Sequence, residues 1–137
     1  MTKPETPPIA VDAIIEDRGS VVLIKRKNPP FQDCWALPGG FVDIGETVEN
    51  SCMREAKEET DLDVEIRQLI GIYSEPKRDP RGHVVSAAFL CTKKSGILKG
   101  KDDAKEASWY LLDILPPLAF DHEKIINDAK NILLSKR

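Results

Sequence analysis

Residues 40–62 read GFVDIGETVENSCMREAKEETDL, and this stretch decides how the chain is interpreted. It starts with glycine, which permits unusual backbone conformations close to a ligand. From about Thr47 to Thr60 it has the composition of a helix. The run REAKEETD at positions 54–61 carries four carboxylates, and Glu46 and Glu49 lie just upstream. This is more negative charge than a surface helix needs.

A helical wheel shows where these carboxylates point. If the wheel starts at Val48 and advances by about 100° per residue, Cys52 marks the apolar face at about 40°. Glu59 falls at about 20° and Glu55 at about −20°, within the same stripe, and Glu58 lies beside them at about −80°. Carboxylates on a partly buried side repel one another, and desolvation strengthens the repulsion. We therefore expect a cation to compensate them.

Two basic residues of the segment supply only part of this compensation. Arg54 can pair with Glu58 four residues on, and Lys57 lies nearby. They do not balance the whole acidic set. A hard divalent cation would do so, because Mg²⁺ and Mn²⁺ prefer oxygen ligands and commonly rest on a few carboxylates and on substrate phosphate oxygens. The pattern predicts a metal-binding helix, against the simpler interpretation of a solvated acidic face.

The composition indicates one globular domain over residues 1–137. The chain is 41% hydrophobic and 31% charged, with a formal net charge of −3. This mild acidity disfavours sequence-independent binding to nucleic acid or to an anionic membrane. No apolar run approaches the roughly 20 residues of a membrane span, and the start MTKPETPP lacks the apolar core of a signal peptide. We expect a cytoplasmic protein without nucleic-acid or membrane partners.

The remaining patterns predict an α+β fold. Residues 9–17 and 20–27 flank Arg18 and Gly19 as a hairpin, and residues 63–73 and 84–92 are strand-like. Residues 93–107 are expected to form a charged loop. Asp121 is a candidate N-cap for a final helix with one apolar face. These elements favour a mixed β-sheet sandwiched between helices.

The acidic stretch resembles the Nudix box over 23 residues. That motif is a glycine, five residues, Glu, seven residues, and then Arg-Glu-apolar-x-Glu-Glu-x-Gly-apolar. It is matched here by Gly40, Glu46, Arg54, Glu55, Ala56, Glu58, Glu59 and Leu62. One departure is Asp61 where the family has Gly. A left-handed backbone there costs Asp roughly 1 kcal/mol more than Gly. The resemblance implies the Nudix fold, an α/β/α sandwich, over nearly the full chain.

Enzymes of that family hydrolyse a nucleoside diphosphate linked to another moiety, and the box carries the residues for this reaction. The resemblance implies Mg²⁺ or Mn²⁺ as cofactor and a small-molecule nucleotide as substrate. The implied metal ligands are Glu55, Glu58, Glu59 and the backbone carbonyl of Gly39. Arg54 and Glu46 are implied to orient the carboxylates by ion pairing. The general base is one of Glu55, Glu58, Asp102 and Asp103, and the last two also fit a solvated loop.

Substrate choice is expected to come from residues outside the box. Pro76 lies fifteen positions after Asp61, which resembles the proline pattern of ADP-ribose pyrophosphatases within the family. The basic turn that follows is a candidate for contacting phosphates or the terminal ribose, through Lys77, Arg78, Arg81 and His83. A polar hairpin turn would explain the same residues. An adenine would need an aromatic clamp, for which Phe31 is the candidate we name among Phe31, Trp35, Tyr73 and Phe120, although a place in the core would explain each of them better.

These observations predict hydrolysis of ADP-ribose to AMP and ribose 5-phosphate. One alternative is a house-cleaning pyrophosphatase that acts on oxidised nucleoside triphosphates of the 8-oxo-dGTP type. Another is a Nudix-like sensor that binds such a ligand without turnover, which the intact glutamates disfavour. His83 and His122 are expected in surface or hydrogen-bonding roles, because no nucleophile is arranged with them. The sequence leaves open whether the protein is a homodimer.

Overall fold

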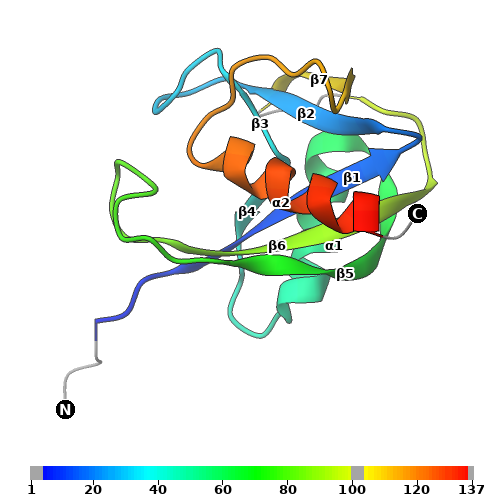
Figure 1. Cartoon of the computed structure of the whole chain (residues 1–137). Helices are drawn as coiled ribbons and strands as arrows, with labels where there is room; N and C mark the ends of the chain where they lie inside the picture. Colours follow the sequence, from blue (N-terminus) through cyan, green and yellow to red (C-terminus); the bar gives the residue numbers. More distant parts are fainter. Residues whose placement is uncertain (1–4, 100–103, 136–137) are drawn as a thin grey trace.

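The computed structural model describes residues 5–99 and 104–135. Seven strands and two helices follow one another along these residues (Figure 1). In chain order they are β1 (Ile9–Asp17), β2 (Ser20–Arg26), β3 (Trp35–Ala36), β4 (Gly39–Phe41), α1 (Val48–Thr60), β5 (Asp63–Tyr73), β6 (Val85–Ser95), β7 (Ala104–Leu111) and α2 (His122–Ser135).

The sheet is mixed, as predicted. Its strand order is β3-β2-β1-β6-β5, with β4 paired to β1 and β7 paired to β2. The expected hairpin joins β1 and β2 through Arg18 and Gly19, both of which have positive φ, the turn geometry that matches strand twist. The pair β1 and β6 is parallel, whereas the other pairs are antiparallel.

The two helices cover opposite faces of this sheet (Figure 1). Because side chains alternate along a strand, β1 feeds two cores. Val11 and Ile15 pack in the cluster that contains Cys52 of α1. Ile14 packs in the cluster that contains Ile125 of α2. The predicted α/β/α arrangement is therefore confirmed.

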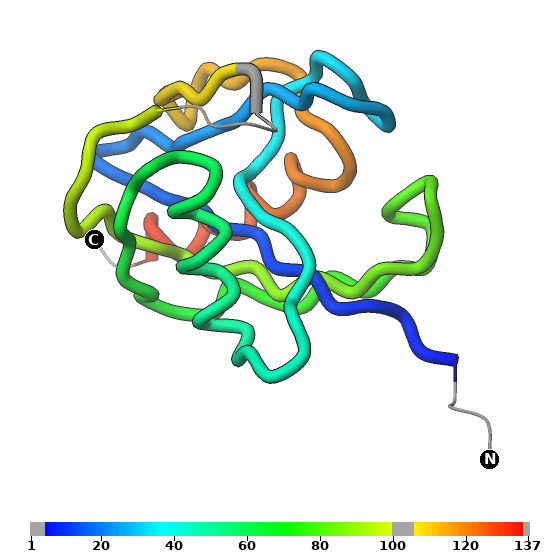
Figure 2. The backbone as a smooth tube through the Cα atoms, turned by 180° about the vertical axis from the view of Figure 1, so that it is seen from behind, coloured from blue at the N-terminus to red at the C-terminus, as the bar shows by residue number. Residues whose placement is uncertain are grey.

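Local signals set both ends of α1. The Thr47 side chain caps the helix by accepting a hydrogen bond from the Asn50 N–H at 3.0 Å. The helix ends at Thr60, and its C-cap is Asp61, whose φ of 66° is left-handed and whose N–H donates to the Lys57 carbonyl. The departure from glycine therefore falls on the left-handed position that the resemblance predicted. Figure 2 shows the cyan segment with β3 and β4 running beside α1 before it turns into the first helical turn.

The prediction of a loop over residues 93–107 is wrong at both ends of that range. Strand β6 continues to Ser95, and β7 begins at Ala104. Backbone pairing with β5 and β2 sustains these strand ends, and pairing does not depend on apolar side chains. Polar composition therefore misplaced the strand boundaries.

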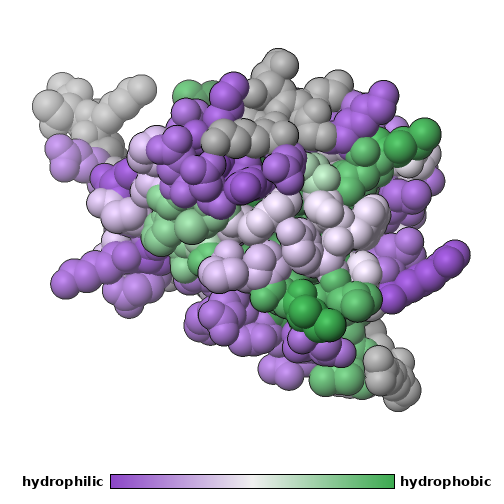
Figure 3. Space-filling model, turned by 90° about the horizontal axis from the view of Figure 1, so that it is seen from above, coloured by the Kyte–Doolittle hydropathy of each residue, from purple (hydrophilic) through white to green (hydrophobic). Residues whose placement is uncertain are grey.

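The surface seen in Figure 3 mixes polar and apolar groups. On that face the hydrophobic side chains of the described residues form separate clusters between hydrophilic ones. No helix within residues 5–99 and 104–135 is long and apolar enough to cross a membrane.

Candidate active site

Arg54 lies at the centre of the acidic face of α1. Its Nε and Nη2 donate to the two carboxylate oxygens of Glu46 at 2.7 and 2.9 Å. Its Nη1 donates to Glu55 at 2.8 Å and to Glu58 at 3.2 Å. The hydrogen bond from Arg54 lowers the pKa of Glu46 to about 2, and these contacts raise the pKa of Arg54. One guanidinium thus donates hydrogen bonds to three carboxylates, with that of Asp43 3.5 Å from its Nη2, and the group keeps a negative charge.

Glu55 is the more buried of the two helix glutamates that Arg54 contacts. Its side chain is 14% exposed, against 58% for Glu58. Burial raises the pKa of Glu55, although the hydrogen bond and charge of Arg54 oppose the shift. The carboxylate lies against Gly40 in β4, where an added Cβ would be 2.5 Å from the Glu55 Cδ. The box glycine therefore leaves the room that this carboxylate occupies.

Glu59 ties the last turn of α1 to β4. Its Oε1 accepts a hydrogen bond from the Gly39 N–H at 2.7 Å. A Cβ at position 39 would lie 2.1 Å from the Val11 carbonyl oxygen, so only glycine fits here against β1. The Gly39 peptide, for which the resemblance implies a metal-binding carbonyl, is thus in contact with a glutamate of the acidic face.

The chemistry of this face fits a divalent cation. The atoms that could bind a metal here are carboxylate oxygens, the ligands that hard cations prefer. One of these carboxylates, that of Glu55, is half-buried and has a raised pKa. Within the described part of the chain, no three ligating side chains converge on one point. The hydrogen bonds explain why, since Arg54 engages Glu55 and Glu58 while Gly39 engages Glu59. The assignment of metal ligands stays a prediction.

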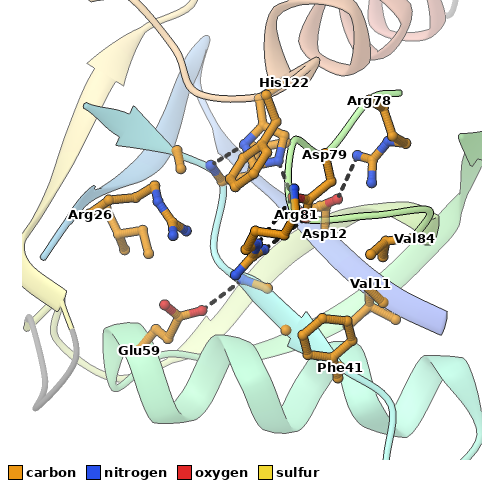
Figure 4. Close-up of a pocket in the computed structure, with 17 residues that line it drawn as sticks. Val11, Asp12, Arg26, Phe41, Glu59, Arg78, Asp79, Arg81, Val84 and His122 are labelled. Carbon is orange, nitrogen blue, oxygen red and sulfur yellow. Dashed lines mark hydrogen bonds and ion pairs between the residues drawn. The ribbon is translucent and has the colours of Figure 1, made fainter. Parts of the chain in front are cut away.

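A cavity of about 110 Å³ opens beside the acidic face (Figure 4). Gly39, Gly40 and Glu59 form part of its wall, and Arg26 and Phe120 are among the residues that line the rest. Sites that enclose drug-sized ligands are commonly about 300–1,000 Å³. This cavity can therefore enclose only one part of a nucleotide, and the remainder would lie outside it.

Two of the arginines predicted to bind substrate line this cavity, and each already has a carboxylate partner. Arg78 donates to Asp121 at 2.6 and 2.8 Å, and its side chain is only 5% exposed. Arg81 donates to Asp79 at 2.8 and 3.1 Å. The structure therefore brings Arg78 and Arg81 to the site in ion pairs that the sequence did not predict.

A buried polar pair at the cavity wall was missed by the sequence analysis. The Nδ1 of His122 accepts a hydrogen bond from the Leu37 N–H at 3.0 Å, which leaves the ring proton on Nε2, 3.3 Å from Asp12. Burial opposes the charge on Asp12, but His122, Ser86 and Arg78 together hold its pKa below the usual value. The hydrogen-bonding role expected for His122 is confirmed. The signal for Asp12 was a lone acid inside an apolar strand.

The aromatic candidate Phe31 lies beside the cavity. Its ring packs edge-on against Phe120, with the ring centroids 4.9 Å apart, and its side chain is partly exposed. Phe120 lines the cavity itself. An adenine clamp by Phe31 stays a prediction, and the geometry places Phe120 closer to the site.

The other predicted residues lie elsewhere. Lys77 lines a separate open groove along β5 and the start of α2. His83 is exposed, its Nε2 lies 3.1 Å from the Ser74 carbonyl, and it is not among the residues that line the cavity. Asp102 and Asp103, the base candidates of the late loop, lie outside the described residues.

Comparison with known proteins identifies the family. A model of the NUDIX domain matches residues 6–129. An ADP-ribose pyrophosphatase of Methanocaldococcus jannaschii is 58% identical over 122 residues, which cover 89% of this chain and 72% of that protein. A putative 8-oxo-dGTP diphosphatase of Bacillus subtilis is 32% identical over 119 residues, or 86% of this chain and 76% of that protein.

A solved structure agrees with these matches. The NUDIX domain of Shewanella oneidensis NrtR, complexed with ADP ribose, superposes with a TM-score of 0.82 at 29% identity, covering 94% of this chain and 90% of that one. The fold, the box residues and these relatives agree, and the chain belongs to the Nudix family.

Proposed function

We propose that this Nudix protein is a hydrolase that uses Mg²⁺ or Mn²⁺ to split ADP-ribose into AMP and ribose 5-phosphate. The observation that carries the proposal is the contact between Glu59 and Gly39. It joins the acidic face of α1 to a cavity lined with arginine and phenylalanine side chains. A diphosphate can then lie at the acidic face while one end of the substrate enters the cavity.

The box residues have separate tasks in this proposal. A bound divalent cation supplies neutralisation of the diphosphate and activation of water. Glu55, Glu58 and Glu59 would hold it, with the Gly39 carbonyl. Arg54 orients Glu55 through the hydrogen bond at 2.8 Å, which restricts the position of the carboxylate.

The proton acceptor for the attacking water is one of four carboxylates. Glu55 is half-buried beside β4, whereas Glu58 faces solvent. Only Glu55 of these two is held in a sterically restricted place, which favours it among the described candidates. Asp102 and Asp103 remain candidates from the late loop.

The relatives support ADP-ribose as the substrate. The archaeal relative at 58% identity is an ADP-ribose pyrophosphatase, and the NrtR domain binds ADP ribose. The Bacillus subtilis relative supports the second candidate, an oxidised nucleoside triphosphate, at the lower identity of 32%. The three box glutamates favour turnover over the sensor alternative.

A substrate panel tests the proposal. The values of kcat/KM would be measured with Mg²⁺ for ADP-ribose, 8-oxo-dGTP and several nucleotide sugars, with EDTA as the metal-free control. We expect the highest value for ADP-ribose and no turnover in EDTA. A higher value for 8-oxo-dGTP with release of pyrophosphate would favour the second candidate. Tight binding of ADP-ribose without turnover would identify a sensor.

A further inference from the structure

The backbone that joins β3 to β4 is held at three successive residues. The Leu37 N–H donates to the Nδ1 of His122 at 3.0 Å, so a side chain of α2 holds the first residue. The Pro38 carbonyl accepts a hydrogen bond from the Ala13 N–H of β1 at 2.8 Å. The Gly39 N–H donates to a glutamate of α1 at 2.7 Å. Three different elements thus fix this stretch of backbone, one residue each.

Strand pairing directs the Gly39 carbonyl toward α1. Gly39 lies opposite Asp12 in the antiparallel pair of β4 and β1. The neighbouring residues, Pro38 and Ala13, are hydrogen-bonded to each other. Bonded and non-bonded pairs alternate along such strands, and both backbone groups of a residue in a non-bonded pair point away from the partner strand. The Gly39 carbonyl therefore points to the same side as its N–H, which contacts Glu59.

Asp12 determines which nitrogen of His122 can hold this backbone. The His122 Nε2 lies 3.3 Å from the Asp12 Oδ1, and the Ser86 hydroxyl donates to the other carboxylate oxygen. The pKa of Asp12 lies below its usual value, so the carboxylate is ionised at neutral pH and only accepts hydrogen bonds. The imidazole proton is therefore held on Nε2, and Nδ1 is left to accept from Leu37.

Attachment of α2 to the sheet does not by itself account for this buried pair. The side chains of Ile125 and Ile126 are fully buried and already pack α2 into the core. The Tyr73 hydroxyl of β5 donates to Asp128 of α2 at 2.6 Å, which is a second attachment. What His122 adds is a bond to the backbone two residues before the carbonyl for which metal binding is predicted.

We propose that His122 and Asp12 are positioning residues for the divalent cation, which hold residues 37–39 so that the Gly39 carbonyl faces the glutamates of α1. This inference rests on the proposed function, because the cation is part of that function. Figure 4 shows His122 joined by dashed lines to Asp12 and to a backbone nitrogen, with Glu59 bonded to the backbone farther along. Asp12 acts through His122, and His122 acts through Leu37.

Two substitutions of His122 separate the tasks of its two nitrogens. In His122→Asn the side-chain oxygen can replace Nδ1 and accept from Leu37, while the donor to Asp12 is lost. In His122→Gln the longer amide can replace the Nε2 donor, while the acceptor for Leu37 is lost. The control is Asp128→Ala, which removes the bond at 2.6 Å that joins α2 to β5 and leaves the contact with Leu37 unchanged.

Binding of Mn²⁺ without substrate measures the effect on the cation site directly. The electron paramagnetic resonance signal of free Mn²⁺ would be titrated against each full-length protein, and circular dichroism would establish that each is folded. We expect His122→Gln to bind Mn²⁺ about ten- to a hundredfold more weakly than wild type, as loss of a group that orients a metal ligand commonly does. His122→Asn should keep most of the affinity, and Asp128→Ala should bind as wild type does.

The variant Asp12→Asn tests the position of the imidazole proton. Its amide can donate to Nε2 of His122, which moves the ring proton to Nδ1, where it opposes the Leu37 N–H. Nitrogen-15 nuclear magnetic resonance distinguishes the two forms, and the chain has only one other histidine, His83, whose signals His83→Asn would identify. We expect the proton on Nε2 in wild type and on Nδ1 in Asp12→Asn, together with weaker Mn²⁺ binding in the variant.

Four results would overturn the inference. They are wild-type Mn²⁺ affinity in His122→Gln, equal losses in His122→Asn and His122→Gln, the ring proton on Nδ1 in wild type, and no Mn²⁺ binding by wild type at millimolar concentration. Equal losses would show that His122 only fills its buried site. If His122→Gln does not fold, the spectra of wild type and the Mn²⁺ affinity of Asp12→Asn still decide. Failure of the proposed function is a separate result, namely no AMP from ADP-ribose with a wild type that binds Mn²⁺.

Discussion

Replacing Gly40 by Ala tests whether Glu55 works at the reacting centre. The φ of Gly40 is not in the left-handed region, so the backbone can accept alanine. The new Cβ, however, would lie 2.5 Å from the Cδ and Oε2 atoms of Glu55, and ordinary contacts begin at 3.4 Å. The carboxylate must therefore move by about 0.9 Å or more, and a misplacement of about 1 Å can cost about a hundredfold in rate.

The fold should survive this change. Replacing glycine by alanine at a permitted backbone conformation stabilises by about 0.4–1 kcal/mol, because the unfolded chain loses freedom. Displacing Glu55 weakens its hydrogen bond from Arg54, and a bond between charged groups contributes about 1.5–3 kcal/mol. The free energy of unfolding should fall by no more than about 2.5 kcal/mol.

The assay measures kcat for ADP-ribose hydrolysis, and the melting temperature is measured on the same protein samples. The matched control is Gly71→Ala in β5, where a Cβ would meet Tyr73 at an ordinary 3.5 Å. We expect kcat of Gly40→Ala to fall by about a hundredfold and that of the control to stay near wild type. A folded Gly40→Ala protein with the wild-type kcat would refute the placement of Glu55 at the reaction.

Three further predictions follow from the acidic face and the late loop. Glu59→Gln keeps an acceptor oxygen for the Gly39 N–H, so in thermal melts with EDTA the variant should melt no lower than wild type. With Mg²⁺ the variant should melt lower, because metal binding stabilises the wild type by RT ln(1 + [L]/Kd). The same order of melting temperatures in both buffers would contradict a metal role. Arg54 lowers the pKa of Glu46 to about 2 in the folded protein, against about 4.3 in the unfolded chain. Ionised Glu46 therefore stabilises the fold fully at pH values above about 4.3, and this stabilisation is lost as the pH falls through about 2. Urea unfolding of Glu46→Gln should therefore depend less on pH between about 4 and 2, and an unchanged slope would argue against the pairing. If Asp102 or Asp103 is the general base, its Asn variant should lose about 10²- to 10⁴-fold in kcat with little change in Mg²⁺ affinity, and near-normal rates in both variants would return the role to the box glutamates.

The sequence predicted the parts of the site that lie on one helix. Helical periodicity alone placed Glu55 and Glu59 on the side of Cys52, and the structure half-buries both glutamates there. The left-handed Asp61 was predicted from its place in the motif. These features depend on contacts between residues close in sequence, which spacing can report.

Contacts between distant segments were the part that could not be predicted. Asp12 and His122 are 110 positions apart and meet only because α2 packs on the face of β1 that carries Asp12. Arg26 gave no signal in the sequence as a cavity residue, because its contact with Phe120 joins segments that are far apart along the chain. The pairing of Arg81 with Asp79 is local, yet a turn rich in charge permits many such pairs, and the fold selects one.

The most direct test of the account is the identity of the products. Wild-type protein would be incubated with ADP-ribose and Mg²⁺ and followed by ³¹P nuclear magnetic resonance. The account predicts that the two diphosphate signals disappear while two monophosphate signals, those of AMP and ribose 5-phosphate, grow in equal amounts. Persistence of the diphosphate signals in the folded, Mg²⁺-loaded protein would contradict it.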